Sequence, residues 1–426
     1  MTSHRPVDFT LAHYSGDRTT GQLALIRRRA GHVEIQSLPQ APQSDLPPPF
    51  KPILLGLTDA AGAVLLDPQT KKIRVQSSFP GDAFPAHVYA DPGSSRDWFM
   101  NDGDKESGND RLNCGDKGSS VTVIDDSGSP QATFLKTLCV GRGHHQATFT
   151  APAAAAPHVP RRACISNLND GTISVIGNDP QDAATYLHVV ATIDLSERDK
   201  EKDPNAPSVP NTAFPHGLAY SPSTGKLYNL NNGYGTIALI DPVTCQIEER
   251  INFKGHSNLF PVPGGRYLVG RGADRKTDPN HVIAKISVFD PVTKSVVDKI
   301  DLRDIYLSKY FFNPEGTRLY FTTSSSGSPE QQKHIKPDVL LVFDLTVLPR
   351  LKLVAELRLS ASVGTLAFVG DEGGTTRLVL ASCTDDGTVA LIDAPSAELI
   401  SRIKVGEPAS HSRLWQAGSR RVAAGT

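Results

Sequence analysis

Short runs of apolar residues that alternate with small or polar ones recur along the chain, and nearly all end in aspartate. Their period-two pattern and their content of Val and Ile are typical of β-strands. Several follow a turn rich in Gly, Asn and Asp, such as CTDDGT (383–388). The seven runs are AVLLD (63–67), VTVID (121–125), ISVIG (173–177), IALID (237–241), ISVFD (286–290), LLVFD (340–344) and VALID (389–393).

Each run stands inside a larger unit that has further strands on both sides. Segments such as FNPEGTRLYFT (312–322) have the pattern of strand, tight turn and strand, and DPVTKSVVDKIDL (290–302) adds another strand after an aspartate. Units of about 50 residues with four short strands each are the sequence signature of a β-propeller. The pattern therefore predicts an all-β chain that folds as a seven-bladed β-propeller.

The two ends of the chain complete this prediction. The first unit lacks its innermost strand, and the segment SHSRLWQAG (410–418) has the pattern to supply it. We therefore expect this C-terminal innermost strand to close the ring against the blade that begins near Pro52. Residues 1–50 are then an N-terminal extension that packs on the propeller, and residues 51–426 form the propeller itself.

The charge balance excludes some partners. The chain has 44 Lys and Arg against 45 Asp and Glu, a formal net charge of −1. Nucleic acids and anionic membranes select basic surfaces, so neither is predicted as a partner. No apolar run approaches the roughly 18 residues of a membrane-spanning helix, and no secretion signal is visible. The sequence as it stands indicates a cytoplasmic protein, or a periplasmic one if a leader has been removed.

Five widely spaced cysteines give a weaker signal about the redox environment. Their odd number and the absence of a CxxC pair favour reduced thiols over a disulfide framework or a zinc site. A disulfide between Cys114 and Cys139 stays open as an alternative. The five are Cys114, Cys139, Cys164, Cys245 and Cys383.

The repeat units also resemble a known class of propeller. The segment PHGLAYSPSTGKLYNLNNGYGTIALIDPVT (215–244) is similar to the YVTN-type repeats that also occur in cytochrome d1-like propellers. The resemblance extends over nearly all of residues 51–418 and implies the propeller fold. It implies no activity, because propellers of this class carry many unrelated functions.

Histidines recur near the predicted start of the innermost strands. Four of them precede an aromatic residue by four positions, as His216 precedes Tyr220, and His87 has the matching place with Asp91 in the aromatic position. The two remaining units have Ser308 and Gly364 there. Innermost strands of a propeller begin at its central channel, so we expect these imidazoles to converge on the channel mouth. The predicted metal ligands are His87, His145, His216, His256 and His411.

An arc of imidazoles without thiolates or paired carboxylates favours copper, with iron or zinc as alternatives. His144 is predicted to be a further ligand or to support the site. Lys309 and Arg142 are predicted to face an anionic substrate, although an ordinary salt bridge explains Arg142 equally well. The arc resembles the copper sites of nitrous oxide reductase and thiocyanate dehydrogenase, which are seven-bladed propellers with histidines around the channel mouth.

The sequence therefore leads to one main functional hypothesis and two alternatives. The main hypothesis is a metal-dependent oxidoreductase, with copper as the expected metal, that acts on a small molecule and exchanges electrons with a partner. The first alternative is a non-catalytic propeller scaffold that binds a protein partner, with structural histidines. The second is a lactonase-type hydrolase, which would need carboxylates rather than imidazoles at the channel.

Overall fold

The computed structural model describes residues 7–16, 21–30, 32–38, 53–57, 62–67, 72–78, 84–102, 114, 119–125, 133–359, 361–408 and 411–416. This part of the chain is almost entirely β-structure, apart from helix α1 (Pro329–Gln332) and the 3₁₀ turn η2 (Arg198–Lys200). The strands are β1 (Phe9–Gly16), β2 (Gly21–Arg29), β3 (His32–Leu38), β4 (Ile53–Leu57), β5 (Gly62–Asp67), β6 (Lys72–Ser78), β7 (Phe84–Ala90), β8 (Arg96–Asp102), β9 (Ser119–Asp125), β10 (Thr133–Val140), β11 (His144–Thr150), β12 (Arg162–Asn167), β13 (Thr172–Gly177), β14 (Val189–Asp194), β15 (Pro215–Ser221), β16 (Lys226–Asn231), β17 (Thr236–Asp241), β18 (Gln246–Asn252), β19 (Asn258–Pro261), β20 (Leu268–Asp274), β21 (Ile283–Asp290), β22 (Ser295–Arg303), β23 (Leu307–Phe312), β24 (Arg318–Thr323), β25 (Val339–Asp344), β26 (Lys352–Arg358), β27 (Val363–Gly370), β28 (Thr376–Cys383), β29 (Thr388–Asp393), β30 (Glu398–Lys404) and β31 (His411–Gln416).

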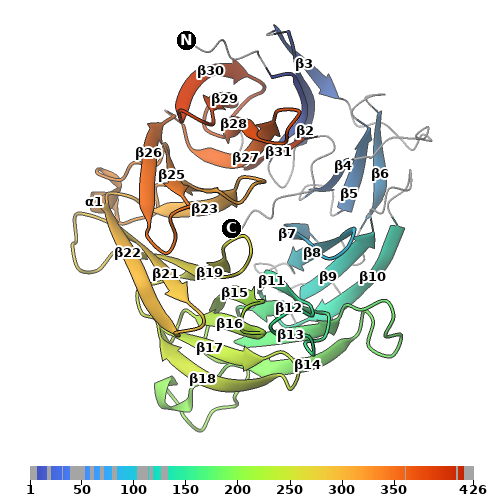
Figure 1. Ribbon diagram of the computed structural model, residues 1–426, viewed down its shortest axis with the longest axis vertical. Helices are drawn as coiled ribbons and strands as arrows, with labels where there is room; N and C mark the ends of the chain where they lie inside the picture. The colour runs from blue at the N-terminus through green and yellow to red at the C-terminus, as the bar shows by residue number, and fades with distance from the viewer. Residues whose placement is uncertain are drawn as a thin grey trace.

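These strands form seven four-stranded antiparallel sheets and one three-stranded sheet. Figure 1 shows the sheets arranged in chain order around a common centre, with one edge strand of each sheet toward the middle. The protein is therefore a β-propeller, and its seven four-stranded sheets confirm the fold predicted from the repeats. The four-stranded sheets have the orders β3-β2-β1-β31, β10-β9-β8-β7, β11-β12-β13-β14, β15-β16-β17-β18, β19-β20-β21-β22, β23-β24-β25-β26 and β27-β28-β29-β30.

Burial along the strands explains the sequence pattern. The third strand of a sheet, such as β25, is buried along nearly its whole length because neighbouring sheets cover both of its faces. The fourth strand, such as β26, alternates between exposed and partly buried residues because one of its faces meets solvent. The seven apolar runs found in the sequence are confirmed as strands, and they are β5, β9, β13, β17, β21, β25 and β29.

Hydrophobic side chains join each sheet to the next. One cluster contains Phe260 and Val269 from one sheet together with Phe321 and Leu341 from the sheet that follows. Further clusters bridge other neighbouring pairs of sheets in the same way. Burial of apolar surface between sheet faces is therefore what stabilises the arrangement around the centre.

Glycine is required at some of the turns that the sequence indicated. Gly387 lies between β28 and β29 with a φ of 62°. A Cβ atom there would lie 2.2 Å from the carbonyl oxygen of Gly406. A larger residue would therefore meet both backbone strain and a steric clash.

The pairing of the C-terminal strand differs from the prediction. Strand β31 pairs with β1, with Trp415 opposite Ala12, and not with the blade that begins near Pro52. Residues assigned to an N-terminal extension thus supply three strands of this sheet, and Leu11 and Leu414 share one apolar cluster. The segment QLALIR (22–27) has the alternation of the repeated run but ends in Arg27. Because it does not end in aspartate, this segment falls outside the pattern of the repeated runs.

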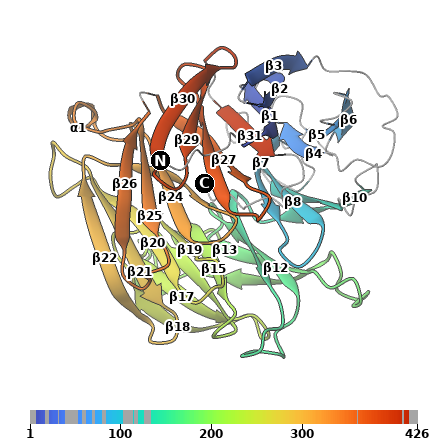
Figure 2. The same ribbon diagram turned by 45° about the horizontal axis from the view of Figure 1, so that its top comes forward.

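The predicted first unit forms a sheet of its own. Strands β4, β5 and β6 make the three-stranded sheet, and Figures 1 and 2 show it between the sheet of β1–β3 and the sheet of β7–β10. Its central strand β5 contains the run AVLLD (63–67). Its edge strand β4 pairs with β5 alone, so the C-terminal strand does not complete this sheet.

Two further expectations concern the chain as a whole. Cys114 and Cys139 form a disulfide, so the prediction of reduced thiols is wrong for this pair. Cys164, Cys245 and Cys383 are free. In the described segments no helix has the length and apolar character needed to cross a membrane.

Candidate functional site

Antiparallel topology brings four strand ends of each four-stranded sheet to one face of the propeller. The innermost strand begins there, the second ends, the third begins and the fourth ends. In one sheet these positions are Leu307, which pairs with Thr323, and Val339, which pairs with Arg358 and donates its backbone N–H to the Thr323 hydroxyl. We call this face, on which His216 and Leu307 lie, the mouth face.

A β-bulge occurs where several innermost strands begin. In β15, Pro215 pairs with Asn231 and Gly217 pairs with Leu230, so His216 is the extra residue. Bulges insert one unpaired residue and turn its side chain away from the regular alternation of the strand. Similar register shifts occur near the start of β7, β11, β23 and β27.

The strand register shows that the five predicted metal ligands do not all occupy the same position in their strands. In β11 the shift includes His145, so His145 and His216 occupy corresponding positions. In β7, Pro85 pairs with Asn101 and His87 with Met100, which makes Ala86 the extra residue. The expectation that all five histidines share one position is therefore wrong, because the spacing to an aromatic residue does not detect bulges.

The two remaining histidines lie outside such bulges. His256 precedes β19, whose pairing with β20 is regular. His411 pairs with Gly16 in the regular ladder between β31 and β1. In addition, the three-stranded sheet separates the sheet of His411 from that of His87 (Figure 1).

His216 lies in a partly buried and electropositive environment. Burial and the nearby Arg271 guanidinium lower the pKa of His216 to about 4, partly opposed by a hydrogen bond to the backbone of Ser257. The imidazole is therefore neutral at neutral pH. Ser257 belongs to the next sheet, so His216 links two neighbouring blades at the mouth face.

His256 is held by its own sheet and by the connection that precedes it. Its Nε2 lies 2.9 Å from the hydroxyl of Ser287, and its Nδ1 lies 3.2 Å from the carbonyl oxygen of Lys254. The ring stacks on Phe253 with 4.1 Å between centroids. Because both nitrogens already contact protein atoms, binding of a metal would require His256 to give up one of these contacts.

The other predicted ligands are less fully defined. His87 is partly buried, and its ring centroid is 6.5 Å from that of Tyr89. The side chains of His144, His145 and His411 lie outside the described residues. Among the side chains that the structure describes, no group of three or more His, Cys, Asp or Glu residues is arranged to hold a metal.

Both predicted cations bind protein groups. Lys309 donates from Nζ to the carbonyl oxygen of Gly364, at 2.9 Å, on the neighbouring innermost strand. The Nε of Arg142 is 2.6 Å from Asp170, which also accepts a hydrogen bond from the Arg142 backbone. The salt bridge that the sequence left open for Arg142 is thus present.

Side chains that reach the next blade are a common feature of the mouth face. Gln146 donates to the carbonyl oxygen of Leu218 at 3.1 Å. Arg271 donates to that of Leu307 at 3.0 Å. Together with Lys309 and His216, these contacts connect the starts of successive innermost strands.

Arg271 was missed in the sequence. It lies on β20 and is 7 % exposed. Its signal is a charged residue within the segment YLVGRGA (267–273), which otherwise has the pattern of a buried strand. The side chain lies at the mouth face because β20 ends there, beside the start of β23.

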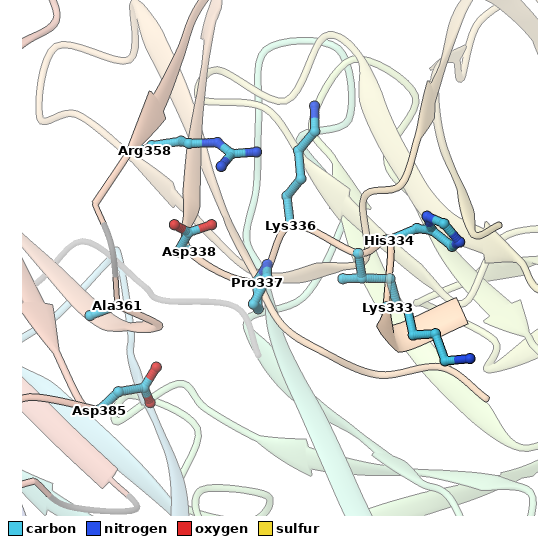
Figure 3. Close-up of a pocket in the computed structure, with 9 residues that line it drawn as sticks. Lys333, His334, Lys336, Pro337, Asp338, Arg358, Ala361 and Asp385 are labelled. Carbon is cyan, nitrogen blue, oxygen red and sulfur yellow. The ribbon is translucent and has the colours of Figure 1, made fainter. Parts of the chain in front are cut away.

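A separate cavity of about 460 Å³ lies farther out on the mouth face. Figure 3 shows that its lining combines basic and acidic side chains, including Arg358, Asp338 and Asp385. Lys336 and Lys333 of this lining form ion pairs with Glu356 and Glu330. The charge of the lining is therefore mixed, with two lysines paired to carboxylates and Asp338 and Asp385 beside Arg358.

Comparison with known proteins gives the fold and no family. No protein-family model matches the chain, and no curated protein matches it. The periplasmic gluconolactonase PpgL of Pseudomonas aeruginosa superposes with a TM-score of 0.55 at 12% identity, over 97% of this chain and 99% of that one. A protein from Lactobacillus plantarum gives 0.52 at 13% identity, over 96% and 100% of the two chains.

A third similar structure is the hydrazine synthase of Kuenenia stuttgartiensis. It has a TM-score of 0.50 at 14% identity and covers 78% of this chain and 89% of that one. At such low identities the likeness concerns the backbone arrangement alone. The comparisons therefore confirm the propeller fold. Any function has to be inferred from the residues of the mouth face.

Proposed function

We propose that the protein is an enzyme that acts on a small molecule at the mouth face, as a metal-dependent oxidoreductase with copper as the first candidate metal. The observation that carries the proposal is the register of the bulges, which gives His145 and His216 corresponding positions on neighbouring innermost strands. Two of the similar structures, a gluconolactonase and a hydrazine synthase, are enzymes by name, which supports small-molecule chemistry on this scaffold.

The proposed ligand set is centred on these two histidines. We add His87 and His411 from other innermost strands, although neither occupies the position that corresponds to His216. We exclude His256 because protein groups contact both of its ring nitrogens. Copper, or iron or zinc in its place, would supply redox or Lewis-acid chemistry when bound. Lys309 and Arg271 bring positive charge to the same face and favour an anionic substrate.

Metal analysis tests the proposal directly. The full chain is loaded with Cu²⁺, freed of excess metal, and its copper content is measured by elemental analysis. The wild type is expected to retain a stoichiometric amount, and His145→Ala/His216→Ala is expected to lose nearly all of it. His158→Ala is the matched control, because His158 is exposed and lies outside the mouth-face strands. Equal copper content in all three proteins would refute the metal site.

A second candidate function is a non-catalytic scaffold for a protein partner. The observation in its favour is the set of contacts that hold His256 to Ser287 and Phe253, since these give a histidine a structural role. In this case copper retention is absent from the wild type as well. The same metal analysis therefore decides between the two functions.

A further inference from the structure

Arg271 is a buried cation without an acidic partner among the residues that the structure describes. No carboxylate lies within ion-pair distance of it there. The groups that act on it electrostatically are Tyr306, Tyr310 and His216, and none of them is a carboxylate. An isolated charge is costly to bury, so buried guanidinium groups normally have an anionic partner.

The hydrogen bonds of Arg271 leave one edge of its guanidinium available. Nη1 donates to the carbonyl oxygen of Leu307 at 3.0 Å. Nε is buried and has no acceptor among the described atoms. In the planar guanidinium, the N–H bonds of Nε and Nη2 run parallel along the edge opposite Nη1. This edge matches the two oxygens of a carboxylate.

The surroundings of Arg271 would strengthen such a pair. Tyr310 is buried and stacks on Phe260 with 3.5 Å between centroids. Neutral, largely apolar neighbours screen charge much less than water does. A carboxylate at this edge would thus gain both a directional pair of hydrogen bonds and a weakly screened charge interaction.

We propose that the Nε–Nη2 edge of Arg271 binds the carboxylate group of a small-molecule ligand at the mouth face, beside His216. The inference deepens the proposed function, on which it rests for the location of the site, by assigning a class of substrate. It concerns binding alone and involves no bond making or breaking.

The test measures binding of malonate to the metal-free full-length protein by isothermal titration calorimetry. Sodium chloride at equal ionic strength serves as the reference for general salt effects. Wild type is expected to bind malonate saturably. Arg271→Met should bind at least about tenfold more weakly, because a bidentate charged contact is lost. Arg271→Lys, which keeps the charge and loses the fork of donors, should also bind more weakly than wild type.

Two controls separate binding from a structural role. Arg266→Gln removes the same charge from an exposed arginine near the turn between β19 and β20, on the opposite face, and should bind malonate like wild type. The urea midpoint of ligand-free Arg271→Met should equal or exceed that of wild type, because an unpaired buried charge has been replaced by an apolar side chain.

Several results would overturn the inference. These are malonate affinity unchanged in Arg271→Met, absence of malonate binding to wild type, or a marked loss of stability in ligand-free Arg271→Met. The copper content of the same preparations is measured separately. Malonate binding without copper retention would remove the proposed oxidoreductase function and leave the carboxylate site standing.

Discussion

Individual residues at the mouth face differ chiefly in what holds their side chains. His216 reaches the backbone of Ser257 in the next blade, whereas His256 contacts Ser287 of its own sheet and the carbonyl of Lys254 in the connection that precedes β19. The same residue type, at the same distance from an aromatic residue in sequence, therefore has two environments. A bulge at one strand and a regular ladder at the other cause the difference.

His256→Ala is expected to lower the free energy of unfolding by about 1–3 kcal/mol, because two hydrogen bonds at about 0.5–1.5 kcal/mol each are lost. The stacking on Phe253 is lost as well. Urea denaturation followed by tryptophan fluorescence measures the change. His188→Ala, at an exposed position, is the control and should match wild type. Copper retention should be the same in both variants, and a drop specific to His256→Ala would return this residue to the ligand set.

At the scale of elements, the sheet that unites both chain ends depends on polar as well as apolar contacts. His13 on β1 is buried, and its Nε2 lies 3.1 Å from the hydroxyl of Ser382 on β28. Burial lowers the pKa of His13 to about 4. The neutral imidazole thus joins the terminal sheet to its neighbour, and Leu11 and Leu414 pack into the same contact.

The lowered pKa of His13 predicts a pH dependence of stability. Between pH 6.5 and about 4 the unfolded chain binds a proton at His13 and the folded chain does not. The contribution of His13 to the free energy of unfolding is therefore complete above pH 6.5 and is lost as the pH falls. Wild type should therefore lose more stability than His13→Gln when the pH is lowered from 6.5 to 4.5. Thermal unfolding at both pH values measures this. Parallel losses in the two proteins would contradict the assignment.

For the whole molecule, the pairing of β31 with β1 determines how the two ends of the chain are held. Without β31, the backbone groups of β1 would form an open sheet edge, and such edges promote aggregation. The apolar cluster between this sheet and the sheet of β27–β30 would also lose Leu414. The fold therefore depends on a contact between residues that are about as far apart in sequence as the chain allows.

A chain truncated after residue 408 should unfold at lower temperature and aggregate more readily than the full chain. The loss of one edge strand and of an apolar side chain at the core gives the expected direction. Differential scanning calorimetry and light scattering provide the measurements. Truncation after residue 416 keeps β31 and should retain the thermal stability conferred by this strand. If the two truncated chains behave alike, the pairing does not stabilise the propeller.

The sequence by itself determined the strands of the repeated runs and their grouping into units, but not the strands of the terminal sheet. Alternating runs such as IALID (237–241) and VALID (389–393) predict strands because alternation reflects two faces in different surroundings, a local property of the pattern. Repetition of the unit then predicts the propeller. The same information indicated that histidines gather near the starts of innermost strands.

Tertiary structure alone decided the pairing of the chain ends and the details of the candidate site. Whether β31 meets β1 or the blade near Pro52 depends on long-range packing, which a local pattern does not encode. A bulge of one residue changes which side chain faces the mouth, and it leaves almost no trace in sequence spacing. Arg271 became a candidate only once its burial and the absence of an acidic partner in the described structure were visible.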